Sequence, residues 1–190
     1  MPVIYTEKYD HEIVKYNPRY YNDGCYTSEE WTDIDDDGEV YSGKVFTLSE
    51  YLEVEQRYIN TIVDIMKIVG SKYLTAHYAN LYYSDKDLLD SDFLSEVFSN
   101  SDFYDEDISL LHYFKTFDKK KRITIKMIDP IARLCMREYM FVTLVDRKHR
   151  LKFEFGYDLY LSATCGSINQ EQFNKIVRKN DLYLAKNAKR

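Results

Sequence analysis

The chain has 190 residues, of which 45% are hydrophobic and 31% charged, with a formal net charge of −6 at pH 7. This apolar content suffices for a packed interior and excludes a disordered chain, and the length is that of one domain. The most apolar stretch, Ile59–Val69, is interrupted by polar residues and falls short of the ~20 apolar residues of a membrane span. We therefore expect one domain over residues 1–190 and no membrane partner.

The N-terminus and the cysteines bear on the cellular compartment. Residues Met1–Glu7 lack the basic and apolar regions of a secretion signal. The three cysteines, Cys25, Cys135 and Cys165, are odd in number and lack CxxC spacing, which favours reduced, structural thiols over disulfides or a zinc site. Both features predict a cytoplasmic protein.

Charge is unevenly distributed along the chain. Residues 1–110 contain 24 acidic and 8 basic side chains, a net charge of −16, whereas residues 111–190 contain 8 and 18, a net charge of +10. The 19 tyrosines suit partly wet binding surfaces. A field of one sign attracts an oppositely charged partner, so the asymmetry indicates a partner for one half. The alternative is that the two halves neutralise each other within the fold.

The N-terminal 46 residues contain two short alternating pieces, Ile4–Tyr9 and Glu12–Tyr16, followed by a polar acidic segment, Asn22–Glu39. The pattern predicts N-terminal strands and a long acidic loop ahead of a helix and sheet core over residues 47–190. Long loops in compact domains are often functional, so this loop is the first candidate for a contact surface.

Part of this loop, Asp33–Val40, matches the start of an EF-hand calcium loop, with acidic residues at positions 1, 3 and 5 and Gly38 at position 6. The twelfth position is Lys44, where calcium binding requires a bidentate Glu. A solvated acidic loop is therefore the better interpretation, and we expect no metal site.

A capping box at Thr47–Glu50 predicts that a helix begins there. Apolar residues then recur at three-and-four spacing over Leu48–Val69, and Gly70 is placed to end the helix. Tyr73–Tyr83 is rich in tyrosine and favours a strand, although its two alanines also fit a helix. Next, Ser84–Asp107 combines carboxylates with spaced apolar residues, a pattern typical of short amphipathic helices with an acidic outer side.

The pattern of the C-terminal part predicts a hairpin and further short elements. Ile123–Met127 alternates like a strand, and a short helix is predicted over Ile131–Arg137, with Asp129 and Pro130 at its start. The predicted hairpin has arms Tyr139–Val145 and Leu151–Ala163.

A second capping box, Ser167–Gln170, predicts a helix to Arg178, followed by a closing strand, Asp181–Leu184. The fold class predicted is α+β. It is a single domain in which an antiparallel sheet, built from the hairpin and the last strand, packs against the Leu48–Val69 helix.

No motif for catalysis or cofactor binding is present. The histidines are scattered, and phosphate-binding glycine loops and nucleophile motifs are missing, so we expect no enzyme and no cofactor. His77 could act as a general base, but a hydrogen-bonded packing role is the commoner one. The basic residues Lys119–Arg122, Arg147, Lys148 and Arg150 could bind phosphates, but the acidic remainder would repel nucleic acid, which we do not expect as a partner.

Two stretches resemble immunity proteins of bacterial polymorphic-toxin and contact-dependent growth inhibition systems. One is Gly43–Glu55 followed by Tyr58-Ile59, and the other is Leu134–Phe141 followed by Phe153–Leu161, which contains the sequence FGYDLY. The resemblance covers about a quarter of the chain. It implies a small cytoplasmic protein that binds and occludes the toxin domain delivered by neighbouring cells, and toxins of this class include many nucleases.

The acidic composition agrees with an inhibitor of a basic nuclease, since carboxylates can accept hydrogen bonds from the Lys and Arg donors that normally hold phosphates. An alternative is an acidic DNA mimic that inhibits a nuclease or restriction factor, and another is an unrecognised hydrolase with His77 or His112 beside two carboxylates. A further alternative is that the carboxylates only keep the protein soluble.

For the inhibitor, Trp31 is singled out as the only tryptophan, placed among carboxylates where an aromatic anchor is a plausible hot spot, although it could equally fold back onto the core. Arg137-Glu138 and Gly156–Asp158 are interpreted as scaffold. The expected partner-binding residues lie in the acidic loop and in the acidic segment before residue 108: Glu29, Glu30, Trp31, Asp33, Asp35, Asp36, Asp37, Asp85, Asp87, Asp90, Asp92, Asp102, Asp105, Glu106 and Asp107.

Overall fold

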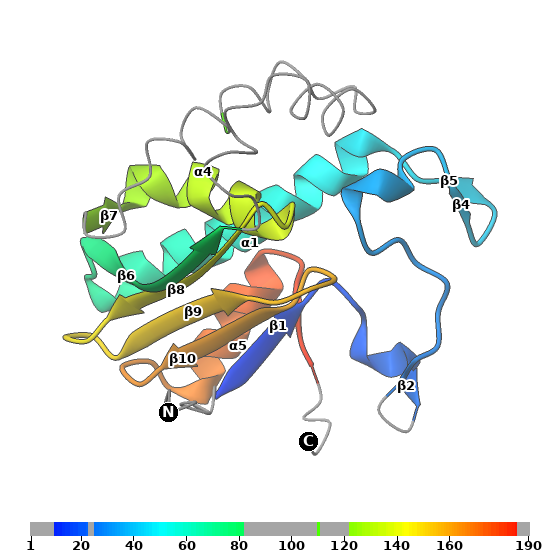
Figure 1. Ribbon diagram of the computed structural model, residues 1–190. Helices are drawn as coiled ribbons and strands as arrows, with labels where there is room; N and C mark the ends of the chain where they lie inside the picture. The colour runs from blue at the N-terminus through cyan, green and yellow to red at the C-terminus, as the bar shows by residue number, and fades with distance from the viewer. Residues whose placement is uncertain (1–9, 23–24, 82–109, 111–121, 186–190) are drawn as a thin grey trace, which may run out of the picture.

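A seven-stranded antiparallel sheet forms the centre of the computed structural model, which describes residues 10–22, 25–81, 110 and 122–185 (Figure 1). Its strand order is β11-β1-β10-β9-β8-β6-β7. The strands are β1 (His11–Val14), β6 (Tyr73–Leu81), β7 (Arg122–Thr124), β8 (Met140–Asp146), β9 (Leu151–Phe155), β10 (Leu161–Cys165) and β11 (Tyr183–Leu184).

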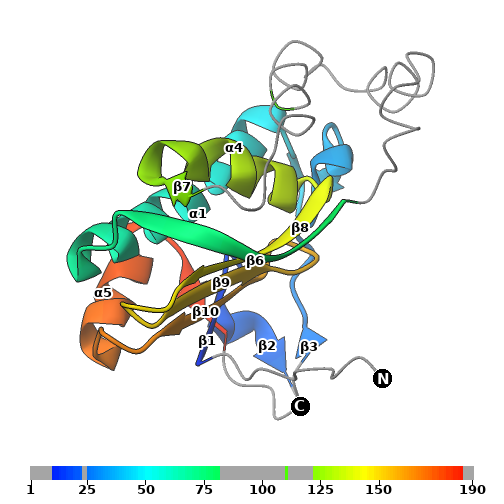
Figure 2. The same ribbon diagram turned by 60° about the vertical axis from the view of Figure 1, so that its left-hand side comes forward.

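Three helices, α1 (Leu48–Val69), α4 (Ile125–Met136) and α5 (Gln170–Lys179), pack on one face of this sheet (Figures 1 and 2). The fold class predicted from the sequence, α+β with an antiparallel sheet against helices, is confirmed. Short elements complete the described chain: η1 (Pro18–Tyr20), β2 (Tyr21–Asn22), β3 (Cys25–Tyr26), η2 (Ile34–Asp36), β4 (Val40–Tyr41) and β5 (Lys44–Val45).

The two faces of the sheet differ in polarity because side chains alternate along each strand. In β9, Leu151, Phe153 and Phe155 are buried beneath the helices, whereas Lys152 and Glu154 on the other face are half-buried. Strand β10 repeats this pattern. The helix-covered face therefore supplies the apolar core, and the outer face carries polar groups.

Helix α1 begins and ends where the sequence predicts. Thr47 and Glu50 form the reciprocal capping box, and Gly70 ends the helix with a φ of 72°, a left-handed conformation that glycine adopts without steric cost. The buried face includes Tyr51 and Tyr58, whose hydroxyls donate to the backbone oxygens of Met136 and Leu159. The predicted strand after Gly70 is also confirmed, as β6.

The prediction for residues 123–137 is wrong in its boundaries. The strand ends at Thr124, and α4 starts at Ile125 and contains Pro130 at its sixth position instead of its first turn. Ile128, Ile131 and Cys135 have helical spacing and are fully or almost fully buried. Burial of this face outweighs the one backbone hydrogen bond that a proline removes.

The predicted second arm of the hairpin, Leu151–Ala163, is two strands, β9 and β10. Gly156–Tyr160 forms a turn between them, in which the Gly156 amide donates to the Tyr160 carbonyl over 2.7 Å, and Asp158 and Leu159 both have positive φ. Most of the FGYDLY sequence is therefore this turn. Tyr157, interpreted from the sequence as part of the scaffold, is 58% exposed.

The start of α5 and the composition of the sheet also differ from expectation. Asn169 caps α5 by accepting from the Gln172 amide, so the cap lies two residues after Ser167, and the helix ends at Lys179. The sheet includes β1, β6 and β7 in addition to the hairpin and the last strand. The predicted helices within Ser84–Asp107 and the piece Ile4–Tyr9 lie outside the described residues.

Candidate functional site

Residues 27–47, which we name the acidic arm, link β3 to α1. They contain seven carboxylates and a single basic residue, Lys44. The arm includes η2 and the β4–β5 hairpin, whose turn residues Ser42 and Gly43 both have positive φ, as a two-residue turn of this kind requires. In Figure 1 this hairpin projects from the body of the molecule beside the N-terminal end of α1.

Hydrogen bonds and an aromatic stack fix the arm to α1. The Trp31 ring stacks on Phe46 with 4.2 Å between ring centroids, and the Tyr51 ring of α1 lies 5.7 Å away. Asp37 accepts a 2.7 Å hydrogen bond from the Leu48 amide in the first turn of α1. Trp31 is half-buried and packs against the core. The sequence left two positions open for this side chain, exposed as an anchor or folded back onto the core, and the structure has the second.

Two arm carboxylates hold η2 in place. Asp33 accepts from the amides of Ile34 and Asp35, and Asp36 accepts from those of Thr32 and Asp33. Burial raises the pKa of the Asp33 carboxyl, and these amide hydrogen bonds offset part of that effect. In the resemblance to a calcium loop, Asp33 would be a ligand; here it binds the backbone of its own turn.

Other arm residues face solvent. Glu29, Asp35, Asp37 and Glu39 are exposed, and Glu30 is half-buried. Beside them, Val40 and Val45 pair directly across the hairpin and are 60% and 53% exposed. An apolar pair bordered by carboxylates has the composition of a protein interface, in which a desolvated centre is surrounded by a polar rim.

The structure brings together the expected partner-binding residues of the arm, Glu29 to Asp37. The remaining eight expected residues lie outside the described part of the chain: Asp85, Asp87, Asp90, Asp92, Asp102, Asp105, Glu106 and Asp107.

Lys15, which follows β1, lies under the base of the arm. Its ammonium is 3.7 Å from the centroid of the Trp31 ring, 4.5 Å from that of Tyr16 and 3.7 Å from a Glu30 carboxylate oxygen. Among the described residues, this nitrogen is the buried side-chain polar atom without a hydrogen-bond partner. Burial lowers the pKa of Lys15 to about 8, although Glu30 partly counteracts the shift.

We expect Lys15 to make unfolding depend on pH between about 8 and 10.5. In this window the unfolded chain holds a proton that the folded chain has released, so the free energy of unfolding rises with pH. Replacing Lys15 with Met removes this contribution. As the pH rises from 7 to 9, the unfolding free energy of wild type should therefore increase by about 1 kcal/mol relative to that of the variant.

Urea unfolding of both proteins at the two pH values measures this change, and taking the difference cancels the titration of buried tyrosines and cysteines. Lys175, whose side chain is 74% exposed, provides the control variant Lys175→Met. Equal pH dependence in wild type and Lys15→Met would show that the Lys15 ammonium is not desolvated in the folded state.

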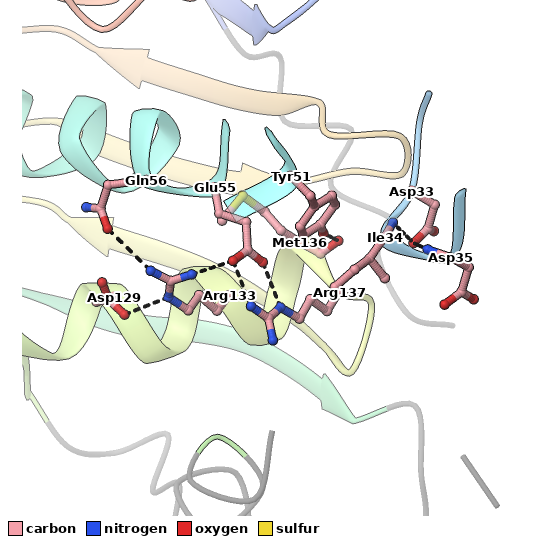
Figure 3. A network of polar contacts seen from close by, with 10 residues as sticks. All are labelled: Asp33, Ile34, Asp35, Tyr51, Glu55, Gln56, Asp129, Arg133, Met136 and Arg137. Carbon is pink, nitrogen blue, oxygen red and sulfur yellow. Dashed lines mark hydrogen bonds and ion pairs between the residues drawn. The ribbon is translucent and has the colours of Figure 1, made fainter. Parts of the chain in front are cut away.

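A second buried charged group joins α1 to α4 (Figure 3). The Glu55 carboxylate is completely buried and accepts two 2.8 Å hydrogen bonds from Arg137 and a third from Arg133. Arg133 also donates to Asp129, one turn earlier on α4. Arg137, interpreted from the sequence as scaffold, belongs to this network, which the sequence analysis missed although Glu55 falls on the apolar face of α1.

The histidines do not form a catalytic group with paired carboxylates in the described chain. His77 lines a pocket with one carboxylate, Asp146, and three cationic residues, rather than the two carboxylates of the hydrolase alternative. His11 stacks on Phe173 in the core, and His149 bonds to Asp146. His112 lies outside the described residues. Across those residues, no three His, Cys, Asp or Glu side chains cluster as a metal site would require.

No family model, curated protein or solved structure matches this chain. In the part of the chain that the structure covers, none of the helices combines the length and apolarity needed to cross a bilayer.

Proposed function

We propose that this protein is an immunity protein that binds a cognate toxin domain, a basic nuclease, and occludes it. The observation that carries the proposal is the acidic arm, which presents exposed carboxylates around the apolar pair Val40 and Val45. The sequence resemblance of Gly43–Glu55 supports it as well, because this stretch spans the end of the arm and the start of α1.

The chemistry of the arm suits a positively charged partner. Carboxylates accept hydrogen bonds from the same Lys and Arg donors that a nuclease uses for phosphates, so the arm can occupy a phosphate-binding groove. Charge of one sign also steers an oppositely charged protein towards the surface. The two valines provide apolar area that becomes desolvated on binding, which supplies affinity that charge alone does not.

The anchors of the arm matter for the same function. Trp31, Asp37 and the backbone hydrogen bonds that Phe46 makes with Gly38 and Glu39 fix the arm before any partner arrives. A preformed surface loses less conformational entropy on binding than a flexible loop does. We place the protein in the cytoplasm, because an inhibitor of a nuclease must meet the toxin where the nucleic acid is.

Titration calorimetry against the toxin domain encoded beside this gene tests the proposal. We expect saturable binding with one-to-one stoichiometry that weakens as salt is added. The triple variant Glu29→Gln, Asp35→Asn, Glu39→Gln neutralises three exposed arm carboxylates that accept no hydrogen bond from described residues. It should bind about tenfold more weakly at low salt, chiefly through slower association.

A matched control removes three exposed carboxylates elsewhere: Asp10→Asn, Glu171→Gln and Asp181→Asn. This control should keep nearly wild-type affinity. A flat titration with the wild-type protein at micromolar concentrations would end the immunity proposal, and equal weakening by both triple variants would move the contact away from the arm.

A further inference from the structure

The outer face of the sheet has an open pocket of about 250 Å³ beside the turn between β8 and β9. Its lining includes Arg147 and Arg150 from the turn, Lys152 from β9, Thr164 from β10 and His77 from β6. Lys152 pairs across the sheet with Thr164 on one side and with Val145 on the other, so the three strands place these side chains in one row.

A β-bulge in β6 directs His77 towards this row. Ala76 pairs with Leu144 and Tyr78 pairs with Thr143, which leaves His77 as the extra residue between two paired positions of β8. His77 is exposed and lines the pocket. Bulges commonly re-aim a side chain beside a functional site, and this one adds an imidazole to the cations of the turn.

Gly166 makes room for the Arg150 side chain. Arg150 has a φ of 54°, a left-handed conformation, and the Gly166 amide donates to its carbonyl over 3.1 Å. A Cβ atom at position 166 would lie 2.7 Å from Arg150 Nε and 2.9 Å from Cζ. The guanidinium therefore lies against Gly166, and a larger residue there would displace it.

The one carboxylate in the lining offsets only part of this positive charge. Asp146 accepts from the amides of Lys148 and His149 through Oδ1, and its Oδ2 bonds to the Ser71 hydroxyl and the His149 ring, each over 2.6 Å. Burial acts to raise the pKa of Asp146, but these hydrogen bonds outweigh it and lower the pKa. The ionised carboxylate is thus held by the turn, and its single negative charge is outnumbered by the guanidiniums of Arg147 and Arg150.

We propose that this pocket binds the phosphate group of a small phosphorylated molecule. Two guanidiniums offer paired N–H donors that match phosphate oxygens, and Thr164 adds a hydroxyl donor. Ligand pockets for whole drug-sized molecules are about 300–1,000 Å³, so this smaller pocket fits a phosphate and the atoms next to it.

This site is independent of the acidic arm. Asp37 of the arm bonds to Leu48 at the start of α1, whereas Ser71, just past the end of α1, bonds to Asp146 beside the pocket. At 1.5 Å per residue, the 22 residues of α1 separate the two by about 33 Å. A phosphate ligand and a toxin can therefore bind at the same time, and failure of one proposal leaves the other standing.

Calorimetric titrations with inorganic phosphate, pyrophosphate, a nucleoside 5′-monophosphate and a sugar phosphate test the site. We expect saturable binding that is stronger for pyrophosphate than for phosphate, because pyrophosphate carries more charge. The double variant Arg147→Gln, Arg150→Gln should weaken pyrophosphate binding at least tenfold. Gly166→Ala should weaken it several-fold by displacing the Arg150 side chain.

Two variants serve as controls: Lys148→Gln, in the same turn but outside the lining, and Arg178→Gln, on α5. Both should bind pyrophosphate within twofold of wild type. Amide chemical-shift mapping on the wild-type protein covers the case in which a variant does not fold, and the shifts should concentrate at His77, residues 145–152 and Thr164.

Three outcomes would overturn the assignment. One is the absence of saturable binding to any of the four probes, and another is shift changes spread over the surface instead of gathered at the pocket. The third is stronger displacement of pyrophosphate by a single-stranded oligonucleotide than by the small probes, at equal phosphate concentration. That result would assign the site to a nucleic-acid backbone.

Discussion

Replacing Glu55 with Gln should lower the free energy of unfolding by about 3–5 kcal/mol, the cost of breaking a buried ion pair by removing one partner. Glu55 is completely buried and its carboxylate accepts from two guanidiniums, of which the Arg137 side chain is 1% exposed. Gln keeps the size of the side chain but has one acceptor oxygen and no charge. The buried Arg137 guanidinium would then lose its contact with the ionised Glu55 carboxylate, whereas Arg133 would keep Asp129.

Urea unfolding monitored by circular dichroism measures this effect as a shift of the midpoint at unchanged slope. Glu53→Gln, an exposed position two residues earlier on α1, is the control and should change stability by less than about 0.5 kcal/mol. A loss below about 1 kcal/mol for Glu55→Gln would mean that water reaches this carboxylate in the folded protein.

Trp31→Ala should destabilise the free protein by about 2–3 kcal/mol, somewhat less than truncation of a fully buried aromatic. The indole stacks on Phe46, contacts Tyr51 and covers the Lys15 ammonium, so its removal exposes both the core beneath the arm and the cation. We also expect faster amide hydrogen exchange across residues 27–47, because the arm loses its main anchor.

Trp31→Phe should retain about half of that stability, since it keeps a ring against Phe46. Unfolding is followed by circular dichroism, because Trp31 is the only tryptophan and fluorescence would be lost with it. If Trp31→Ala unfolds at the wild-type urea concentration, the indole does not hold the arm, and its role would have to lie in contact with a partner.

Local signals in the sequence predicted α1 to the residue. The capping box at Thr47 and the glycine at position 70 act through hydrogen bonds within one turn, so they can be recognised without knowledge of the rest of the fold. Strand β1 overlaps the alternating piece Glu12–Tyr16 that the sequence predicts, but its place between β10 and β11 depends on pairing with residues about 150 to 170 positions away.

The same distinction holds for the candidate sites. The acidic composition of the arm and the basic run at residues 147–150 are visible in the sequence. The anchoring of the arm by Lys15 is not, because a cation over an indole 16 positions away requires the tertiary fold. The bulge at His77 and the clearance at Gly166 also depend on neighbouring strands and turns, so their effect on the pocket could not be predicted from the sequence.

Helix α1 has a polarity of its own that agrees with the charges placed at its ends. The aligned peptide dipoles of a helix leave partial positive charge at the N-terminus and partial negative charge at the C-terminus. Asp37 and Glu50 lie at the first end, and the basic turn bonded to Ser71 lies at the second. A cationic protein that approaches alongside α1 would be attracted to the N-terminal end of the helix and repelled by the C-terminal end. The resulting torque would orient it before contact.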